Sequence, residues 1–322
     1  MTHPPVPLGT FPTPVEPAPR LAAALGLGPE DLWVKRDDLT GLGGGGNKIR
    51  KLEWTVGAAL AEGADTLVTT GAAQSNHARL TAAAGARVGL DVVLVLRGGA
   101  GASRSGNLAL DGLFGARLVW AGEVDQAGLD AAAAEVCDRL RADGARPALI
   151  PFGGSGTLGA RGYVRCGEEL RAQVPDVRTA VVALGSGGTM AGLVAALGTD
   201  AVLGVDVGAL ADPAAAVAEF AAPLTAQEVT ARKLRVRRDQ VGAGYAALTG
   251  PVTEALRLAA RTEGIVLDPT YTGRALAGLR AAVRDGSVRP GEKTVFVHTG
   301  GLPGLFGHAQ AVAAAEEGAG VY

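Results

Sequence analysis

Short runs of β-branched and apolar residues alternate along this chain with alanine-rich stretches that are long enough to form helices. This alternation is typical of α/β proteins, in which mostly parallel sheets are covered by helices on both faces. Such sheets bind ligands beside the carboxyl ends of their strands, so functional residues are expected there. The runs predict seven strands, at 66–70, 92–96, 116–120, 147–150, 179–184, 201–207 and 293–298.

The size and composition of the chain narrow the class of protein further. Its 322 residues exceed the usual size of one compact core, which favours two lobes or one large α/β unit. A net charge of −2 argues against a nucleic-acid partner, and the densest basic run, 232–238, is expected to be a solvated segment. Residues 208–245 are expected to hold helices and a long surface loop.

The two cysteines and the distribution of apolar residues bear on where the protein works. Cys137 and Cys166 have neither disulfide nor metal-ligand spacing, and each falls in a helix-like stretch where a buried, inert thiol is expected. No stretch reaches the roughly 18–20 apolar residues of a membrane span, and no secretory leader is evident. We therefore expect a cytoplasmic protein with no membrane partner and no metal.

A glycine-rich turn follows the predicted strand at 179–184 and opens a helix. Its backbone N–H groups, two hydroxyls and the helix dipole could bind a phosphate; the alternative is a tight turn that only packs the helix on the sheet. Met190 stands where the third glycine of a dinucleotide-binding fingerprint would fall, which argues against that motif. The turn consists of Gly185, Ser186, Gly187, Gly188 and Thr189.

A second glycine-rich stretch, "TGLGGGGNKIRKLEW" at 40–54, precedes one lysine. It resembles a nucleotide-binding P-loop, but Asn47 intervenes before Lys48, and Ile49 replaces the required serine or threonine. A lysine at the start of a helix is commonly a solvated surface residue. Here the flanking glycines favour a loop that lets a bound group approach the amine closely.

Polar residues also mark two other strand ends and one turn ahead of a helix. Ser75, Asn76 and His77 stand where a helix begins, as either an anion site or an ordinary N-cap with His77 exposed. Tyr271 lies in a turn bounded by proline and glycine, and Thr299 ends the last predicted strand. A reactive lysine, a phosphate loop, an anion site and ring contacts are together the components of a pyridoxal phosphate (PLP) enzyme.

In these motifs the chain resembles the family of D-cysteine desulfhydrases and 1-aminocyclopropane-1-carboxylate deaminases, which belong to fold type II of the PLP enzymes, the tryptophan-synthase-β-like group. The resemblance covers nearly the whole length, including "LWVKRDDLTG", "GGNKIRKLE", "TLVTTGAAQSNHARLTAA", "GSGGTMAGL", "LDPTYTGRALAGL" and "VFVHTGGLPGLF". It implies two three-layer αβα lobes. Residues 1–50 and 161–322 would form the large PLP-binding domain, and 51–160 a smaller mobile domain.

The resemblance also implies roles for individual residues. Lys48 would bind the cofactor covalently and later move the α-proton of the substrate, with Ser75 and Tyr271 as further catalytic residues. Asn76 would hydrogen-bond the 3-oxygen of the ring, residues 185–189 would hold the phosphate, and Thr299 would face the ring nitrogen. The substrate would be bound by Ser75, Asn76, His77, Tyr271 and Tyr245.

Two positions separate the branches of this family. The deaminases carry glutamate and glutamine where this chain has Thr272 and His77, so the resemblance favours α,β-elimination from a small β-substituted amino acid over ring opening. The implied reaction converts D-cysteine to pyruvate, hydrogen sulfide and ammonia. L-Cysteate and 1-aminocyclopropane-1-carboxylate are the alternative substrates, and a non-catalytic PLP- or nucleotide-binding protein is the alternative of another class. Members of the family are commonly homodimers.

Overall fold

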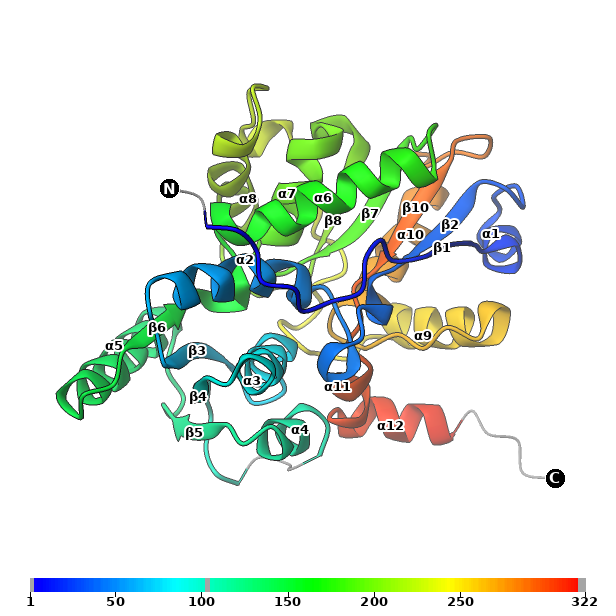
Figure 1. Ribbon diagram of the computed structural model, residues 1–322. Coiled ribbons are helices and arrows are strands. Elements are labelled where there is room, and N and C mark those ends of the chain that lie inside the picture. The colour runs from blue at the N-terminus through cyan, green and yellow to red at the C-terminus, as the bar shows by residue number, and fades with distance from the viewer. Residues whose placement is uncertain (1–2, 102–104, 318–322) are drawn as a thin grey trace.

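Two mostly parallel β-sheets organise the chain, and the computed structural model describes residues 3–101 and 105–317 (Figure 1). The larger sheet has six strands in the order β1-β2-β10-β7-β8-β9, and only β1 runs antiparallel to its neighbour. The smaller sheet has four parallel strands in the order β5-β4-β3-β6. The strand bounds are β1 Val15–Pro17, β2 Leu32–Arg36, β3 Thr66–Ala72, β4 Asp91–Arg97, β5 Arg117–Trp120, β6 Pro147–Ile150, β7 Thr179–Leu184, β8 Val202–Asp206, β9 Arg235–Arg237 and β10 Thr294–His298.

Helices cover both faces of each sheet, as the α/β alternation predicts. None of the helices in the described ranges is long and apolar enough to cross a membrane. The α-helices are α1 Pro19–Leu25, α2 Lys48–Ala61, α3 Asn76–Val88, α4 Asn107–Leu113, α5 Gln126–Ala142, α6 Thr157–Gln173, α7 Gly188–Leu197, α8 Pro213–Ala221, α9 Gly250–Glu263, α10 Thr272–Arg284, α11 Leu302–Phe306 and α12 Ala309–Glu316. Short 3-10 turns are η1 Asp37–Leu39, η2 Leu42–Gly44, η3 Phe152–Gly154, η4 Thr199–Ala201, η5 Ala222–Leu224 and η6 Ala231–Lys233.

Alternating side chains along the buried strands build a separate core on each face of each sheet. On the larger sheet, Val181 of β7 packs with α1, α9 and α10, whereas its neighbour Val182 packs with α6, α7 and α8. On the smaller sheet, Leu67 and Val68 of β3 enter opposite cores in the same way. The expected three-layer αβα architecture is therefore confirmed.

All seven strands predicted from the sequence are present, and three further strands were missed. β1 and β9 are only three residues long, and β2 contains Lys35 and Arg36, so their apolar signal is weak. The basic run at 232–238 is not wholly a solvated segment, because Arg235–Arg237 forms the edge strand β9. Region 208–245 contains one α-helix, α8, in addition to β9. Both cysteines are free and buried, as expected.

A buried ion network fixes α2, the helix that lies between the two sheets (Figure 1). Arg50 on α2 donates hydrogen bonds to Asp37, at 2.8 and 2.9 Å, and to Glu169 on α6, at 2.8 Å each. At Gly162 of α6, an added Cβ would lie only 2.0 Å from the carbonyl oxygen of Arg50, so glycine allows the two helices to touch. The domain boundaries expected near residues 50 and 160 fall inside this pair of packed helices.

Candidate active site

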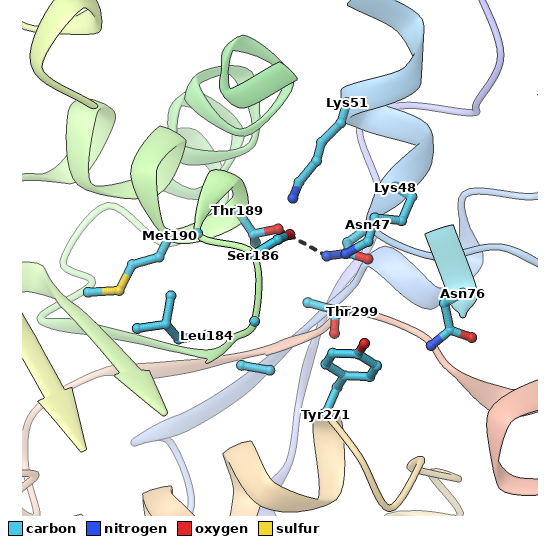
Figure 2. Close-up of a pocket in the computed structure, with 13 residues that line it drawn as sticks. Asn47, Lys48, Lys51, Asn76, Leu184, Ser186, Thr189, Met190, Tyr271 and Thr299 are labelled. Atoms are coloured by element: carbon cyan, nitrogen blue, oxygen red, sulfur yellow. Dashed lines mark hydrogen bonds between the residues drawn. The ribbon is translucent and has the colours of Figure 1, made fainter. Parts of the chain in front are cut away.

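The predicted site residues come together around two adjoining cavities at the carboxyl ends of the strands. The first has an empty volume of about 410 Å³ (Figure 2). The second, of about 670 Å³, shares Lys48, Ser186 and Tyr271 with the first. The predicted residues that line the first cavity are Lys48, Asn76, Gly185, Ser186, Gly187, Thr189, Tyr271 and Thr299. The second adds Ser75, His77 and Tyr245, and Gly188 begins α7 between two residues that line the first.

The glycines before Lys48 allow its loop to pack closely against the protein's own backbone. Gly45 has a φ of 73°, and an added Cβ there would lie 1.9 Å from the carbonyl oxygen of Asp38. Next in the loop, the Asn47 N–H donates a 3.0 Å hydrogen bond to the Thr299 carbonyl oxygen, beyond the end of β10. This packing ties the first turn of α2, which Lys48 begins, to the end of a strand in the larger sheet.

Lys48 is half-buried, and its amine lies in the cavity, 5.9 Å from the centre of the Tyr271 ring. Burial lowers the pKa of Lys48 from 10.5 to about 8; the charge of Asp268 opposes this shift, and the charge of Arg79 adds to it. A substantial fraction of the amine is therefore neutral near pH 8, which is the form that attacks a carbonyl carbon.

The turn at 185–189 forms an open helix N-terminus on the opposite side of the first cavity. The Gly187 backbone has a φ of 89°, and the Gly188 N–H donates to Ser155 Oγ at 3.2 Å. That hydroxyl also lies 2.7 Å from Ser186 Oγ, while Asn47 Nδ2 donates to Thr189 Oγ1 at 3.0 Å. Backbone N–H groups, hydroxyls and the positive end of the helix dipole here suit an anion.

Lys51 is a residue of this site that the sequence reasoning missed. It is fully buried, it lines the first cavity, and its side chain points toward Ser186 and Thr189 (Figure 2). Its Nζ donates to Ser155 Oγ at 3.0 Å and to the Gly153 carbonyl oxygen at 3.3 Å, both neutral acceptors. Burial and the charge of Lys48 lower the pKa of Lys51 well below 10.5. Its spacing of three residues from Lys48, on the same helix face, was the available signal.

Asn76 begins α3, and its side-chain amide is held by Asn107 and Arg79. Asn107 Nδ2 donates to Asn76 Oδ1 at 3.0 Å, and Arg79 Nη2 approaches the same oxygen at 3.5 Å. With the oxygen occupied by two donors, the amide nitrogen of Asn76 faces Thr299 and Tyr271 (Figure 2). The cavity therefore receives a hydrogen-bond donor at this point.

Ser75 and His77 lie at the same helix start, and His77 is not exposed. The Ser75 hydroxyl caps α3 by accepting a 3.1 Å hydrogen bond from the Ala78 N–H. His77 is buried, with Nε2 2.8 Å from Thr69 Oγ1. Burial, reinforced by the charges of Lys48 and Lys51, lowers the pKa of His77 well below 6.5, so the ring is neutral. The N-cap alternative is correct for Ser75, and its exposed histidine is wrong.

The two tyrosines lie over the cavity as a pair. Their hydroxyl oxygens are 2.5 Å apart, and their rings meet edge to face with centroids separated by 6.1 Å. Asp268 Oδ2 accepts the Tyr271 N–H at 2.9 Å and so fixes the turn before α10. Burial raises the pKa of both Tyr245 and Tyr271, which keeps both phenols protonated at neutral pH.

These residues fit pyridoxal phosphate. The open N-terminus of α7 and the buried amine of Lys51, which a phosphate would keep protonated, suit the phosphate of the cofactor. The Lys48 amine suits its aldehyde, and the Asn76 amide suits an oxygen on its ring. Neither cavity is lined by a carboxylate that would repel the phosphate. Within residues 3–101 and 105–317, no group of three or more histidine, cysteine, aspartate or glutamate side chains could hold a metal ion.

Comparison with known proteins agrees with this fit. The family model described as "Pyridoxal-phosphate dependent enzyme" matches residues 6–300. A Pyrococcus horikoshii protein and a Pyrococcus abyssi protein, each with the provisional name 1-aminocyclopropane-1-carboxylate deaminase, are 40% identical to this chain over 308 residues. Each of these alignments covers 91% of this chain and 90% of the relative.

Solved structures show the same fold. A crystal structure titled as an ACC deaminase homologue superimposes with a TM-score of 0.87 at 37% identity, covering 97% of this chain and 96% of that one. Threonine deaminase isoform 2 from Solanum lycopersicum shares the fold at a TM-score of 0.65 and 18% identity, covering 95% and 83%. The chain is thus a fold type II member of the pyridoxal-phosphate dependent enzyme family, and pyridoxal phosphate is its cofactor.

Proposed function

We propose that this enzyme catalyses α,β-elimination on a small β-substituted amino acid, with D-cysteine as the first substrate to test. The products from D-cysteine are pyruvate, hydrogen sulfide and ammonia. The observation that carries the proposal is the Lys48 amine in the cavity, whose lowered pKa lets it act as a base between the phosphate loop and the tyrosine pair. Bound pyridoxal phosphate supplies the electron-withdrawing ring that makes the α-proton of the substrate removable.

In this proposal each part of the first cavity has one task. Lys48 binds the cofactor and later takes the α-proton, and Thr299 faces the ring nitrogen with a neutral hydroxyl. The phosphate is held by residues 185–189 together with Lys51. Asn76 donates to the ring oxygen, a task supported by the hydrogen bond that it accepts from Asn107.

The second cavity receives the substrate. Ser75, Asn76 and His77 bind its carboxylate at the start of α3, and Tyr271 and Tyr245 flank its reacting carbons. Tyr271 also serves as a catalytic hydroxyl beside Lys48, a role supported by its protonated phenol. Water would be excluded by movement of residues 51–160 as a small domain, and the functional unit would be a cytoplasmic homodimer.

Elimination is favoured over ring opening by the residue that follows Tyr271. Thr272 is fully buried and donates its hydroxyl hydrogen bond to Asp268 at 2.8 Å, so this position places no acidic group in the cavity. The names of the Pyrococcus relatives and of the crystallised homologue nevertheless make 1-aminocyclopropane-1-carboxylate an alternative substrate. L-Cysteate is a further alternative, and a non-catalytic cofactor- or nucleotide-binding protein is the alternative of another class.

A substrate panel tests the proposal. Purified holoenzyme is incubated with D- and L-cysteine, D- and L-cysteate, β-chloroalanine, serine and 1-aminocyclopropane-1-carboxylate, and the keto acid formed is identified. We expect pyruvate from D-cysteine, with equal amounts of sulfide and ammonia, and none from a Lys48→Ala variant. 2-Oxobutanoate from the cyclopropane substrate alone would identify a deaminase. An absence of any keto acid would support the non-catalytic alternative.

A further inference from the structure

Arg97 places a second positive charge in the cavity that receives the substrate. It is the last residue of β4, and its Cα is paired in register with Ala72, the last residue of β3, just before the start of α3. Its side chain lines the 670 Å³ cavity together with Lys48 and Tyr245. Arg97 therefore lies at the carboxyl edge of the smaller sheet, beside the residues proposed to hold the substrate.

This guanidinium has no anionic partner in the described part of the chain. Arg97 as a whole is half-buried, but its Nε is buried and has no hydrogen-bond partner among those residues. Lys48 is the other cation among the residues that line the cavity, and neither aspartate nor glutamate lines it. A buried donor on a charged group without a partner is costly, so an anionic ligand at this place would bind favourably.

Arg97 lies close enough to Tyr245 for its charge to act on that phenol. Although burial raises the pKa of Tyr245, the charges of Arg274 and Arg97 oppose that shift. Tyr245 is hydrogen-bonded to Tyr271, whose ring lies beside the Lys48 amine. Arg97 therefore lines the same cavity as this tyrosine pair and Lys48.

In the proposed function, Ser75, Asn76 and His77 bind the α-carboxylate of the substrate. The α-carboxylate is therefore not the anion that Arg97 would bind. We propose that Arg97 is a specificity-determining residue that binds negative charge on the β-substituent of the substrate. This inference rests on the proposed function and narrows it to amino acids whose β-substituent is an anion or leaves as one, such as a sulfonate, a phosphoester or a thiol.

The reaction balances for such substrates without an oxidant or a reductant. The α-C–H bond breaks and its proton passes to Lys48, the bond from Cβ to the substituent breaks, and that electron pair leaves with the substituent. One water then hydrolyses the carbon–nitrogen bond of the product, which gives pyruvate and ammonia. A sulfonate leaves as sulfite and a thiol as sulfide, each with the negative charge that Arg97 stabilises. Opening of a cyclopropane ring releases no anion and gains nothing from Arg97.

Aspartate and asparagine are suitable probes because they have nearly the same shape and differ in charge at the β-substituent. Their equilibrium binding to holoenzyme, in both enantiomeric forms, is measured from the change in the visible absorption of the bound cofactor and from the shift in melting temperature. We expect the better-bound enantiomer of aspartate to bind roughly tenfold to a hundredfold more tightly than the matching asparagine. In Arg97→Gln the ratio of aspartate affinity to asparagine affinity should fall to about one.

Arg117→Gln is the matched control. It removes the same charge from β5 of the same sheet, where Arg117 is more than half exposed and is paired with Asp91 at 3.8 Å. This variant should keep the preference for aspartate. The inference would be overturned if Arg97→Gln kept the wild-type ratio of aspartate to asparagine affinity. It would also be overturned if Arg97→Gln bound both ligands more weakly by the same factor, and that result would assign Arg97 to the α-carboxylate instead.

The two proposals fail separately in this design. If the panel yields no keto acid but the aspartate preference depends on Arg97, the elimination is wrong and the anion site stands. If pyruvate forms and the preference does not depend on Arg97, the elimination stands and the anion site is wrong. Melting curves of Arg97→Gln without ligand check that the variant is folded.

Discussion

Asn107 Nδ2 donates a 3.0 Å hydrogen bond to Asn76 Oδ1 and thereby sets which end of the Asn76 amide faces the cavity. Asn107 is itself held in one orientation, because its Oδ1 accepts from Arg79 Nε at 3.1 Å and its Nδ2 also donates to the Gln74 carbonyl oxygen at 2.9 Å. The hydrogen-bond donor proposed to contact the cofactor ring is thus oriented by a residue that does not line that cavity.

This relationship predicts an unusual order of severity for substitutions at Asn107. Asn107→Asp keeps an acceptor for Arg79 but loses the donor to Asn76, so the Asn76 amide should rotate and present its oxygen to the cavity. We expect pyridoxal phosphate affinity to fall about tenfold in Asn107→Asp and less in Asn107→Ala, which leaves the amide free to turn. Cofactor titration followed by absorbance measures both. A purely structural role would make alanine the more damaging change.

Lys51 is predicted to bind the phosphate rather than the ring. Lys51→Met should weaken binding of pyridoxal phosphate by about tenfold to a hundredfold, because it removes a buried charge from beside residues 185–189. Binding of pyridoxal, which has no phosphate, should change little. Equilibrium titration with both ligands separates the effects, and Lys293→Met, at a partly exposed lysine, is the control. Equal weakening for both ligands would contradict a phosphate contact.

The same variant makes a prediction for the protein without cofactor. The Lys51 ammonium is fully buried, and its partners Ser155 and Gly153 are neutral, which destabilises the charged form. Lys51→Met should therefore leave the free energy of unfolding of the apoprotein unchanged or raise it. The increase in that free energy on binding pyridoxal phosphate should be smaller in the variant than in the wild type. Denaturant unfolding with and without pyridoxal phosphate measures this. A less stable apoprotein would show that Lys51 supports the fold instead.

The lowered pKa of Lys48 predicts how cofactor uptake depends on pH. Only the neutral amine attacks the cofactor aldehyde, so the rate of covalent attachment should rise with pH and level off above about 8. An unperturbed lysine would give a rate that still rises toward pH 10.5. Asp268 holds the pKa of Lys48 up, and Asp268→Asn should therefore move the midpoint to lower pH. Stopped-flow absorbance over this range is the measurement.

The junction of α2 and α6 should be a large contributor to stability. Asp37 is fully buried and accepts hydrogen bonds from Arg50, Thr13 and the Tyr163 hydroxyl. Asp37→Asn leaves the charge of Arg50 poorly compensated, and we expect the free energy of unfolding to fall by about 3–5 kcal/mol. Urea unfolding measures it, with Asp176→Asn at an exposed ion pair as the control. A loss below about 1 kcal/mol would mean that Glu169 alone compensates Arg50.

Much of this architecture could be predicted because α/β alternation is a strong local signal. The strands at 66–70 and 179–184 consist of buried β-branched and apolar residues bounded by turns, and both are present in the structure. Strand β2 was missed because Lys35 looks like a surface residue. Its ammonium is instead buried against Glu169, Gln173 and the Thr13 carbonyl oxygen, and these contacts are distant in sequence.

The residues of the site also divide into those with a local sequence signal and those without one. The residues around Gly185 and Lys48 could be found because glycine patterns and a helix start are local features. Asn107 could not, because its role depends on a hydrogen bond to Asn76, which lies 31 residues away in the sequence. Lys51 has a local signal in its spacing from Lys48, but its burial and its contact with Ser155, 104 residues away, appear only in the folded chain. Arg97 is a further example, since one arginine at a strand end gives no sign in the sequence that its Nε has no hydrogen-bond partner among the described residues.

The central claim is that Lys48 is the residue that holds the cofactor and acts as the base. Holoenzyme is treated with borohydride, which fixes a lysine-bound cofactor permanently, and the labelled peptide is identified by mass spectrometry, with Lys48→Ala and Lys51→Met treated alongside. The account predicts a pyridoxyl phosphate label on Lys48 in the wild type and in Lys51→Met at saturating cofactor, and no labelled lysine in Lys48→Ala. A label on Lys51 or on any other lysine of the wild type would contradict it.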